Sequence, residues 1–325
     1  MTRRSWTLFA AMCVIWGVPY LLIRVAVRDF APGTLVFART AIGGLVLLPF
    51  AFGSGGFGPV LRRWPWVVAF SVIEIAGPWL LLSDAERVLS SSLSGLLVAA
   101  VPLVGVLVAW VARSDDAGGG WPRYLGLLLG LAGVVLLLGL DVGEVRAWPL
   151  VEMLLVAVGY SIAPVIMARK LADLPSIPTI SASLLLTALG YLPYAVLRWP
   201  HHVGAKSLWS VIGLGLVCTA LAFFLFFALI SAIGPSRATV ITYVNPAVAV
   251  LLGVLLLNER FTLGMGIGFP LILLGSVLAA RYHGSHPEPG QSMRTSPAGV
   301  SNTAASTPVS PSNGATHSTS TPSNG

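Results

Sequence analysis

The sequence predicts an all-α integral membrane protein: ten transmembrane helices forming two inverted five-helix repeats, followed by a disordered C-terminal tail. Three observations support this prediction. The composition is too apolar for a soluble domain, about ten apolar runs have the length of a membrane span, and the first half of the chain is echoed in the second.

The composition requires a mostly lipid environment. Hydrophobic residues make up 56% of the 325 residues and charged residues only 10%, and the mean hydropathy is +0.86. A soluble domain has about 25% charged residues, so this chain could not cover itself with a polar surface. The net charge of +7 comes from basic residues scattered between apolar runs. They are typical of loops facing lipid headgroups, so the bilayer is the expected partner and nucleic acid is not.

The apolar runs locate the spans. A bilayer core about 30 Å thick needs roughly 20 apolar residues per helix. The predicted spans are 6–27, 33–52, 65–83, 89–111, 123–140, 147–168, 179–197, 208–230, 236–257 and 262–280. The N-terminus resembles a signal peptide but has no cleavage site before Pro19, so we interpret it as an uncleaved first helix.

The charges and the tail complete the predicted topology. More Lys and Arg residues fall on the side of the N-terminus than on the other side, which favours a topology with both termini cytoplasmic. Residues 282–325 are rich in Ser, Thr, Pro and Gly. Such a segment cannot bury enough apolar surface to fold, so we expect it to be disordered.

An internal repeat divides the remaining chain into residues 1–140 and 141–281. "SSSLSGLLVAAVPLVGVLV" from Ser90 is echoed by "GPSRATVITYVNPAVAVLL" from Gly234, and "PYLLIR" by "PVIMAR". The prolines align in pairs, Pro19 with Pro164 and Pro102 with Pro246, and we expect each to kink its helix. Consecutive halves with five spans each enter the membrane from opposite sides, which is a transporter architecture.

Three segments of the chain resemble a known family. They are "NPAVAVLLGVLLLNERFTLGMGIGFPLILLGSVL", "WGVPYLLIR" and "TLVFARTAIGGLVLLPF". The pattern resembles the EamA family of the drug/metabolite transporter superfamily over about residues 6–280. The resemblance implies a ten-helix inner-membrane carrier with a central cavity, usually an exporter of amino acids, other metabolites or drugs.

Two charged residues fall within predicted spans. Glu74 is near the middle of the third span, where a charge costs about 2.5–3.5 kcal/mol or more. We expect Glu74 to bind a proton, although a structural hydrogen bond is the alternative. Arg39 could pair with Glu74, hold a substrate carboxylate, or extend toward the membrane interface.

Two further acids are weaker candidates. Glu152 lies near the start of the sixth span, which fits either the outer mouth of a pathway or simple exposure. Glu259, followed by Arg260, ends the ninth span, where a boundary charge in the outer loop is the favoured interpretation.

Polar and aromatic residues on the spans provide candidates for a substrate site. Polar residues beside prolines suggest a cavity wall, although bonds between helices use the same residue types. Aromatic rings within the spans could stack on a substrate. The candidates are Tyr20, Trp79, Ser94, Tyr160, Thr242, Tyr243 and Asn245.

The sequence therefore predicts a secondary active transporter, a proton-coupled exporter of small metabolites such as amino acids or of drugs. It would work by alternating access around a midplane cavity. No enzyme motif or metal-ligand cluster occurs, and Cys13 and Cys218 are expected to be buried free thiols, so no cofactor or metal is predicted. The alternatives are a lipid-modifying membrane enzyme and a scaffold that transports nothing. The sequence does not determine the substrate or the oligomeric state.

Overall fold

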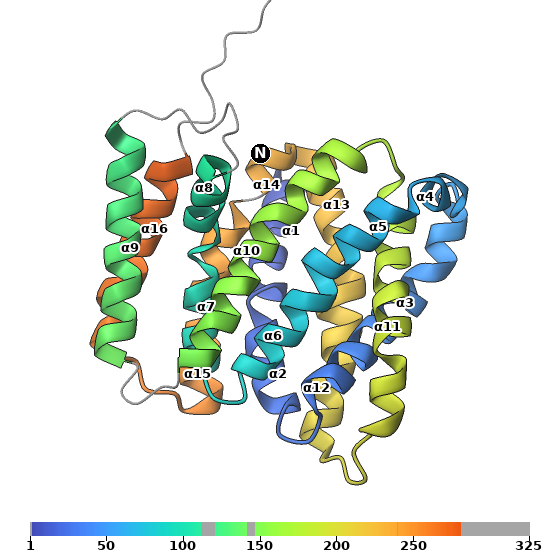
Figure 1. Cartoon of the computed structure of the whole chain (residues 1–325), viewed down its shortest axis with the longest axis horizontal. Helices are drawn as coiled ribbons and strands as arrows, with labels where there is room; N and C mark the ends of the chain where they lie inside the picture. Colours follow the sequence, from blue (N-terminus) through green and yellow to red (C-terminus); the bar gives the residue numbers. More distant parts are fainter. Residues whose placement is uncertain (1, 112–120, 142–146, 239, 281–325) are drawn as a thin grey trace, which may run out of the picture. The chain divides into compact units, whose positions relative to one another are not determined.

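The computed structural model describes residues 2–111, 121–141, 147–238 and 240–280, and all regular elements within them are helices (Figure 1). The predicted disordered tail lies outside these residues. Apolar residues dominate the long segments, and lipid offers their backbone no hydrogen-bond partners, so helical pairing within each segment is the structure that a membrane requires.

The helices before residue 142 follow the first five predicted spans. They are α1 (Arg3–Ile15), α2 (Val18–Ala26), α3 (Pro32–Gly53), α4 (Gly58–Arg62), α5 (Trp64–Phe70), the π-helix η1 (Ser71–Ala76), α6 (Gly77–Ala85), α7 (Ser91–Val98), α8 (Val101–Val111) and α9 (Trp121–Asp141).

The helices after residue 146 follow the other five. They are α10 (Ala147–Lys170), α11 (Ser176–Leu197), α12 (Ala205–Gly215), the π-helix η3 (Leu216–Leu221), α13 (Ala222–Ile233), α14 (Pro235–Ala238), α15 (Ile241–Leu257) and α16 (Leu263–Ala280).

Within the described residues, seven helical stretches are long and apolar enough to cross a membrane. Three shorter apolar helices, Tyr124–Gly139, Ile241–Leu257 and Leu263–Ala279, overlap the remaining predicted spans. The prediction of an all-helical, multi-pass membrane protein is thus confirmed, and a crossing by each of the ten runs stays a prediction.

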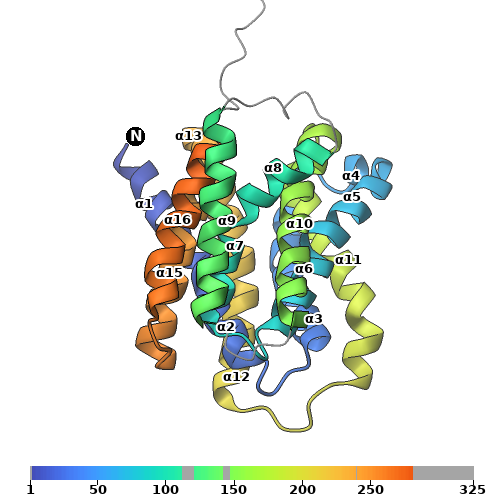
Figure 2. The same ribbon diagram turned by 60° about the vertical axis from the view of Figure 1, so that its left-hand side comes forward.

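Three close helix pairs each join an early segment to a late one. Helix α9 packs along α16, α3 along α11, and α7 along α15 (Figures 1 and 2). Glycines bring α9 and α16 together: a Cβ at Gly126 would lie 2.6 Å from the Ala279 nitrogen, and one at Gly133 would lie 2.7 Å from the Gly268 oxygen. Small residues allow such close backbone approach in membranes.

The paired prolines do not have the same structural role. Pro19 and Pro102 each lie in the first turn of a helix that follows a break, where the missing N–H costs nothing. Pro164 and Pro246 lie inside α10 and α15, which stay helical on both sides of them. In each aligned pair, one proline thus follows a break between helices, and the other lies inside a continuous helix.

The two π-helices were not predicted. They are η1 (Ser71–Ala76) and η3 (Leu216–Leu221), and the shift between them is 216 − 71 = 145, and likewise 221 − 76 = 145. The same shift relates Pro19 to Pro164. By this alignment Thr219 is the counterpart of Glu74. In η1 the cause is local, because Pro78 lacks the N–H that would pair with the Glu74 carbonyl four residues earlier.

Candidate functional site around Arg39 and Glu74

Arg39 joins three helical segments through neutral partners. Its Nε donates to Thr219 Oγ1 of η3 at 3.0 Å, and its guanidinium carbon lies 3.6 Å from the ring centroid of Trp79 in α6. Only 7% of Arg39 is exposed, so it does not extend to the interface. A desolvated cation–π contact is worth about 2 kcal/mol. The contact therefore holds the guanidinium plane in a fixed orientation.

The expected pairing of Arg39 with Glu74 is absent. Among the described residues the ion pairs are Arg63–Asp173 and Arg87–Asp84, and Arg39 takes part in neither. Its Nε–H is one of five N–H donors on the guanidinium group, and the contact with Trp79 is made by an aromatic ring and not by a hydrogen-bond acceptor oxygen. The group thus has the chemistry to receive a planar carboxylate.

Thr219 is itself held in place by the π-turn. Its Oγ1 donates to the carbonyl of Leu214, five residues earlier, at 2.8 Å, so the hydroxyl oxygen is directed to accept from Arg39. Thr219 is fully buried, and Gly43 of α3 lies so close that an added Cβ would be 2.6 Å from Thr219 Cγ2. The small residue on α3 therefore lets η3 approach Arg39.

Glu74 lies in η1 with an unsatisfied carboxylate oxygen. Its Oε2 is buried and has no hydrogen-bond partner among the described residues. Gly159 of α10 packs directly against this π-turn, since a Cβ there would lie 2.6 Å from the Ile73 oxygen and 2.8 Å from Pro78 Cγ. This close approach brings the next residue, Tyr160, into electrostatic interaction with Glu74.

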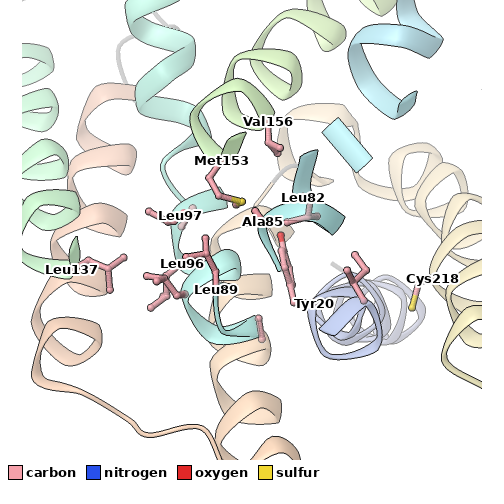
Figure 3. Packing of buried hydrophobic residues seen from close by; sticks show 14 of the residues in the cluster. Tyr20, Leu82, Ala85, Leu89, Leu96, Leu97, Leu137, Met153, Val156 and Cys218 are labelled. Carbon is pink, nitrogen blue, oxygen red and sulfur yellow. The ribbon is translucent and has the colours of Figure 1, made fainter. Parts of the chain in front are cut away.

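The aromatic residues link the two charged groups. Tyr160 also interacts with Arg39 and with the Trp79 side chain. Tyr20 extends from α2 toward Ala85 of α6 (Figure 3), and it interacts electrostatically with Tyr160 and Arg39. The structure therefore brings together five of the predicted residues, which we call the Arg39 group: Tyr20, Arg39, Glu74, Trp79 and Tyr160.

The other predicted residues lie elsewhere. Asn245 is buried, and with its amide oriented to satisfy both atoms its nitrogen donates to the Cys13 oxygen at 3.1 Å and to the Ile241 oxygen at 2.9 Å. It therefore joins α15 to α1. Ser94 is fully buried beside the α7–α15 contact, and its Oγ has no partner among the described residues. Tyr243 is half-buried and Thr242 is exposed, and both belong to α15.

Glu259 lies just past the end of α15, where the sequence placed a boundary charge, and it also caps α7. Its Oε1 accepts from the Ser91 nitrogen at 2.8 Å and Ser91 Oγ at 3.0 Å. Its Oε2 accepts from the Ser92 nitrogen at 2.9 Å and Ser92 Oγ at 2.5 Å. The left-handed residue Asn258, with φ of 54°, turns the chain so that the carboxylate meets the N-terminus of α7.

Two buried acids add to this picture. Glu152 is 3% exposed, which excludes simple exposure, and it interacts with Asp84 and Trp148. Glu86 is 0% exposed and neither carboxylate oxygen has a partner among the described residues. Sequence reasoning missed Glu86 because "SDAER" has the composition of a solvated loop. Only the packing of neighbouring helices over the loop reveals its burial.

Comparison with known proteins identifies the family of the chain. The model of the EamA-like transporter family matches the chain twice, at residues 4–139 and 147–281. The chain is 26% identical over 272 residues to the "uncharacterized transporter YdfC" of Bacillus subtilis, covering 82% of this chain and 85% of that protein. It is 25% identical over 274 residues to the "uncharacterized inner membrane transporter YedA" of Escherichia coli, covering 82% and 88%.

A solved structure shares the fold. One crystal structure superposes with a TM-score of 0.60 at 24% identity and covers 85% of this chain and 97% of its own. The family match covers both halves of the chain, and the relatives are named transporters. The chain is a multi-pass membrane protein and belongs to the EamA-like transporter family.

Proposed function

We propose that this protein is a secondary active transporter that exports small metabolites, such as amino acids, or drugs, in exchange for protons. Its ten spans form two inverted repeats, residues 1–140 and 141–281, around a midplane cavity that opens alternately to the two sides of the inner membrane. Both termini are cytoplasmic in this proposal. The family match, found once in each half, supports it.

The observation that carries the proposal is the Arg39 group. A buried guanidinium with only neutral partners lies in one electrostatic network with a glutamate whose Oε2 is unpaired. An intramembrane cation and acid that are not paired with each other remain able to bind a substrate group or a proton. In the proposed cycle Arg39 receives a substrate carboxylate, the rings of Tyr20, Trp79 and Tyr160 contact the substrate, and Glu74 binds the proton.

The counterpart positions in the two π-helices support different roles for η1 and η3. Glu74 and Thr219 occupy equivalent places at a shift of 145 residues, yet one is an acid and the other a hydroxyl bonded to Arg39. Widened π-turns expose carbonyls and occur at functional sites. Tyr191 Oη donates to the Ala76 oxygen of η1 at 3.0 Å, which satisfies one such carbonyl. The proposal assigns proton binding to η1 and orientation of Arg39 to η3.

Reconstitution tests the proposal. Purified full-length protein is reconstituted into proteoliposomes that are loaded with a mixture of labelled amino acids. Efflux of the label is followed with and without an inward proton gradient. Gradient-stimulated efflux and trans-stimulated counterflow are expected from the wild type. The variant Glu74→Gln should lose stimulation by the gradient and keep counterflow, because exchange moves no net proton. The matched control is Asp173→Asn, which removes an exposed acid and should behave as wild type.

The outcomes separate the parts of the proposal. Full gradient stimulation in Glu74→Gln would remove Glu74 from proton coupling. Absence of counterflow for amino acids and for a panel of cationic dyes would refute a carrier for these substrate classes. A membrane enzyme or a scaffold shows no trans-stimulation, so counterflow also excludes those alternatives.

A further inference from the structure

Glu86 is the most completely buried acid in the described part of the chain. It follows the last residue of α6 and precedes α7, with 0% exposure, and Oε1 and Oε2 both lack partners. Its neighbours Ala85 and Leu89 belong to one hydrophobic cluster with Tyr20 and Leu96 (Figure 3). An ionised carboxylate in such surroundings is far more costly than a protonated one.

The charges around Glu86 do not form an ion pair with it. Arg24 of α2 donates from Nη1 to the backbone carbonyl of Glu86, not to its carboxylate. Arg24 and Arg39 favour the charged form, and Glu259 opposes it. The Glu259 carboxylate is held in place by its bonds to Ser91 and Ser92, so its position relative to Glu86 is fixed.

Burial dominates these effects. It raises the pKa of Glu86 well above its ordinary value, more than Arg24 lowers it. Glu86 is also connected to the Arg39 group, because Tyr20 interacts electrostatically with Glu86, Arg39 and Tyr160, and Tyr160 interacts with Glu74. Electrostatic interactions thus connect Glu74 with Tyr160, Tyr160 with Tyr20, and Tyr20 with Glu86, which we call the Tyr20–Tyr160 series.

We propose that Glu86 is a second proton-binding carboxylate of this carrier, placed at the opposite end of the Tyr20–Tyr160 series from Glu74. The inference rests on the proposed function, since it assigns Glu86 to the same proton pathway. Glu86 carries its proton on a carboxyl oxygen while this end of the protein is packed as observed. When the packing around α2, α6 and α7 loosens, the proton leaves to water and Arg24 pairs with the carboxylate that forms.

Infrared spectroscopy tests Glu86 without a substrate. A protonated carboxyl group has a carbonyl absorption distinct from that of a carboxylate. Spectra are recorded on the full-length protein in liposomes at neutral pH for the wild type, Glu86→Gln, Glu86→Asp, Glu74→Gln and Asp173→Asn. Loss of one protonated-carboxyl component in Glu86→Gln is expected. Glu86→Asp should restore a component at a shifted frequency, and Asp173→Asn should leave the protonated-carboxyl components unchanged.

Thermal unfolding gives a second readout. A raised folded pKa means that the native state holds more protons than the unfolded state, so stability falls as pH rises above 4.5 toward the folded pKa. The unfolding temperature of Glu86→Gln should fall less over this range than that of the wild type, because its amide has no proton to lose.

Each outcome decides between the alternatives. A Glu86→Gln spectrum identical to wild type in a folded sample would overturn the inference. If Glu86→Gln does not fold, a Glu86→Asp spectrum without a shifted component overturns it equally. Failure of the proposed function appears differently: the wild type would show no gradient-driven efflux while the Glu86 component remained visible.

Discussion

Removal of the Glu259 carboxylate should loosen the contact between α7 and the loop that follows α15. The carboxylate accepts two backbone bonds, from the Ser91 and Ser92 nitrogens, and two hydroxyl bonds from the same residues. Glu259→Ala leaves both nitrogens without these partners, while the hydroxyls can rotate to others. Hydrogen bonds to a charged group contribute about 1.5–3 kcal/mol each. With solvent screening at this partly exposed position, we expect a loss of about 2–4 kcal/mol.

The two native cysteines provide the assay. Cys13 and Cys218 are free and buried, so a dye that fluoresces on reacting with thiols reports unfolding. At about 2 °C per kcal/mol, the low end for large domains, Glu259→Ala should lower the unfolding temperature by ~4–8 °C. Glu259→Gln keeps one acceptor oxygen and should lose about half as much.

Arg260 is the matched control, because it is the next residue along the chain and is exposed. Arg260→Ala should shift the unfolding temperature by less than about 1 °C, as most surface substitutions do. A Glu259→Ala protein that unfolds within 1 °C of Arg260→Ala would refute the reasoning, because the four bonds would then contribute nothing to stability.

Three further predictions concern the site and its supports. Gly159→Ala places a Cβ 2.6 Å from the Ile73 oxygen, so thermal unfolding should show a loss of about 1–3 kcal/mol. Gly139→Ala meets nothing within 4 Å and should lose no stability, gaining up to about 1 kcal/mol from helix propensity, and equal stabilities of the two variants would contradict the close packing on η1. Arg39→Lys keeps the charge and loses the planar group, so counterflow should fall at least about tenfold with folding intact; wild-type counterflow would exclude Arg39 from substrate binding. Asn245→Ala removes the bonds to α1 and α15 carbonyls and should cost about 1–3 kcal/mol by the same thermal assay, and an unchanged unfolding temperature would refute a structural role.

The sequence predicted the helices well because lipid imposes a simple rule. Apolar runs of membrane length recover the positions of the long helices, since hydrocarbon leaves the backbone no other way to satisfy its polar groups. It also identified five residues that lie together, because rings and charges inside apolar runs are conspicuous. The alignment of Pro19 with Pro164 even gave the shift that relates the two π-helices.

The sequence could not supply the partners of those residues. Arg39 and Thr219 are 180 positions apart, and their contact depends on how α3 and η3 pack. The surroundings of Glu259 and Glu86 could not be predicted from the sequence either, and the two acids differ in the outcome. Each acid lies at a helix end in a charged, loop-like stretch, yet one is fixed by serines from a distant helix, and the other has buried carboxylate oxygens with no hydrogen-bond partner in the described part of the chain.

The sequence by itself determined that this protein lies in lipid, that it is helical and which family it belongs to, because these properties depend on composition and on the length and spacing of the apolar runs. Tertiary structure alone decided which acids are satisfied and which are not. The cost of a buried charge is set by the atoms that surround it in space, and in this chain those atoms come from segments far apart in the sequence. The unpaired oxygens of Glu74 and Glu86, and the cap at Glu259, are the result.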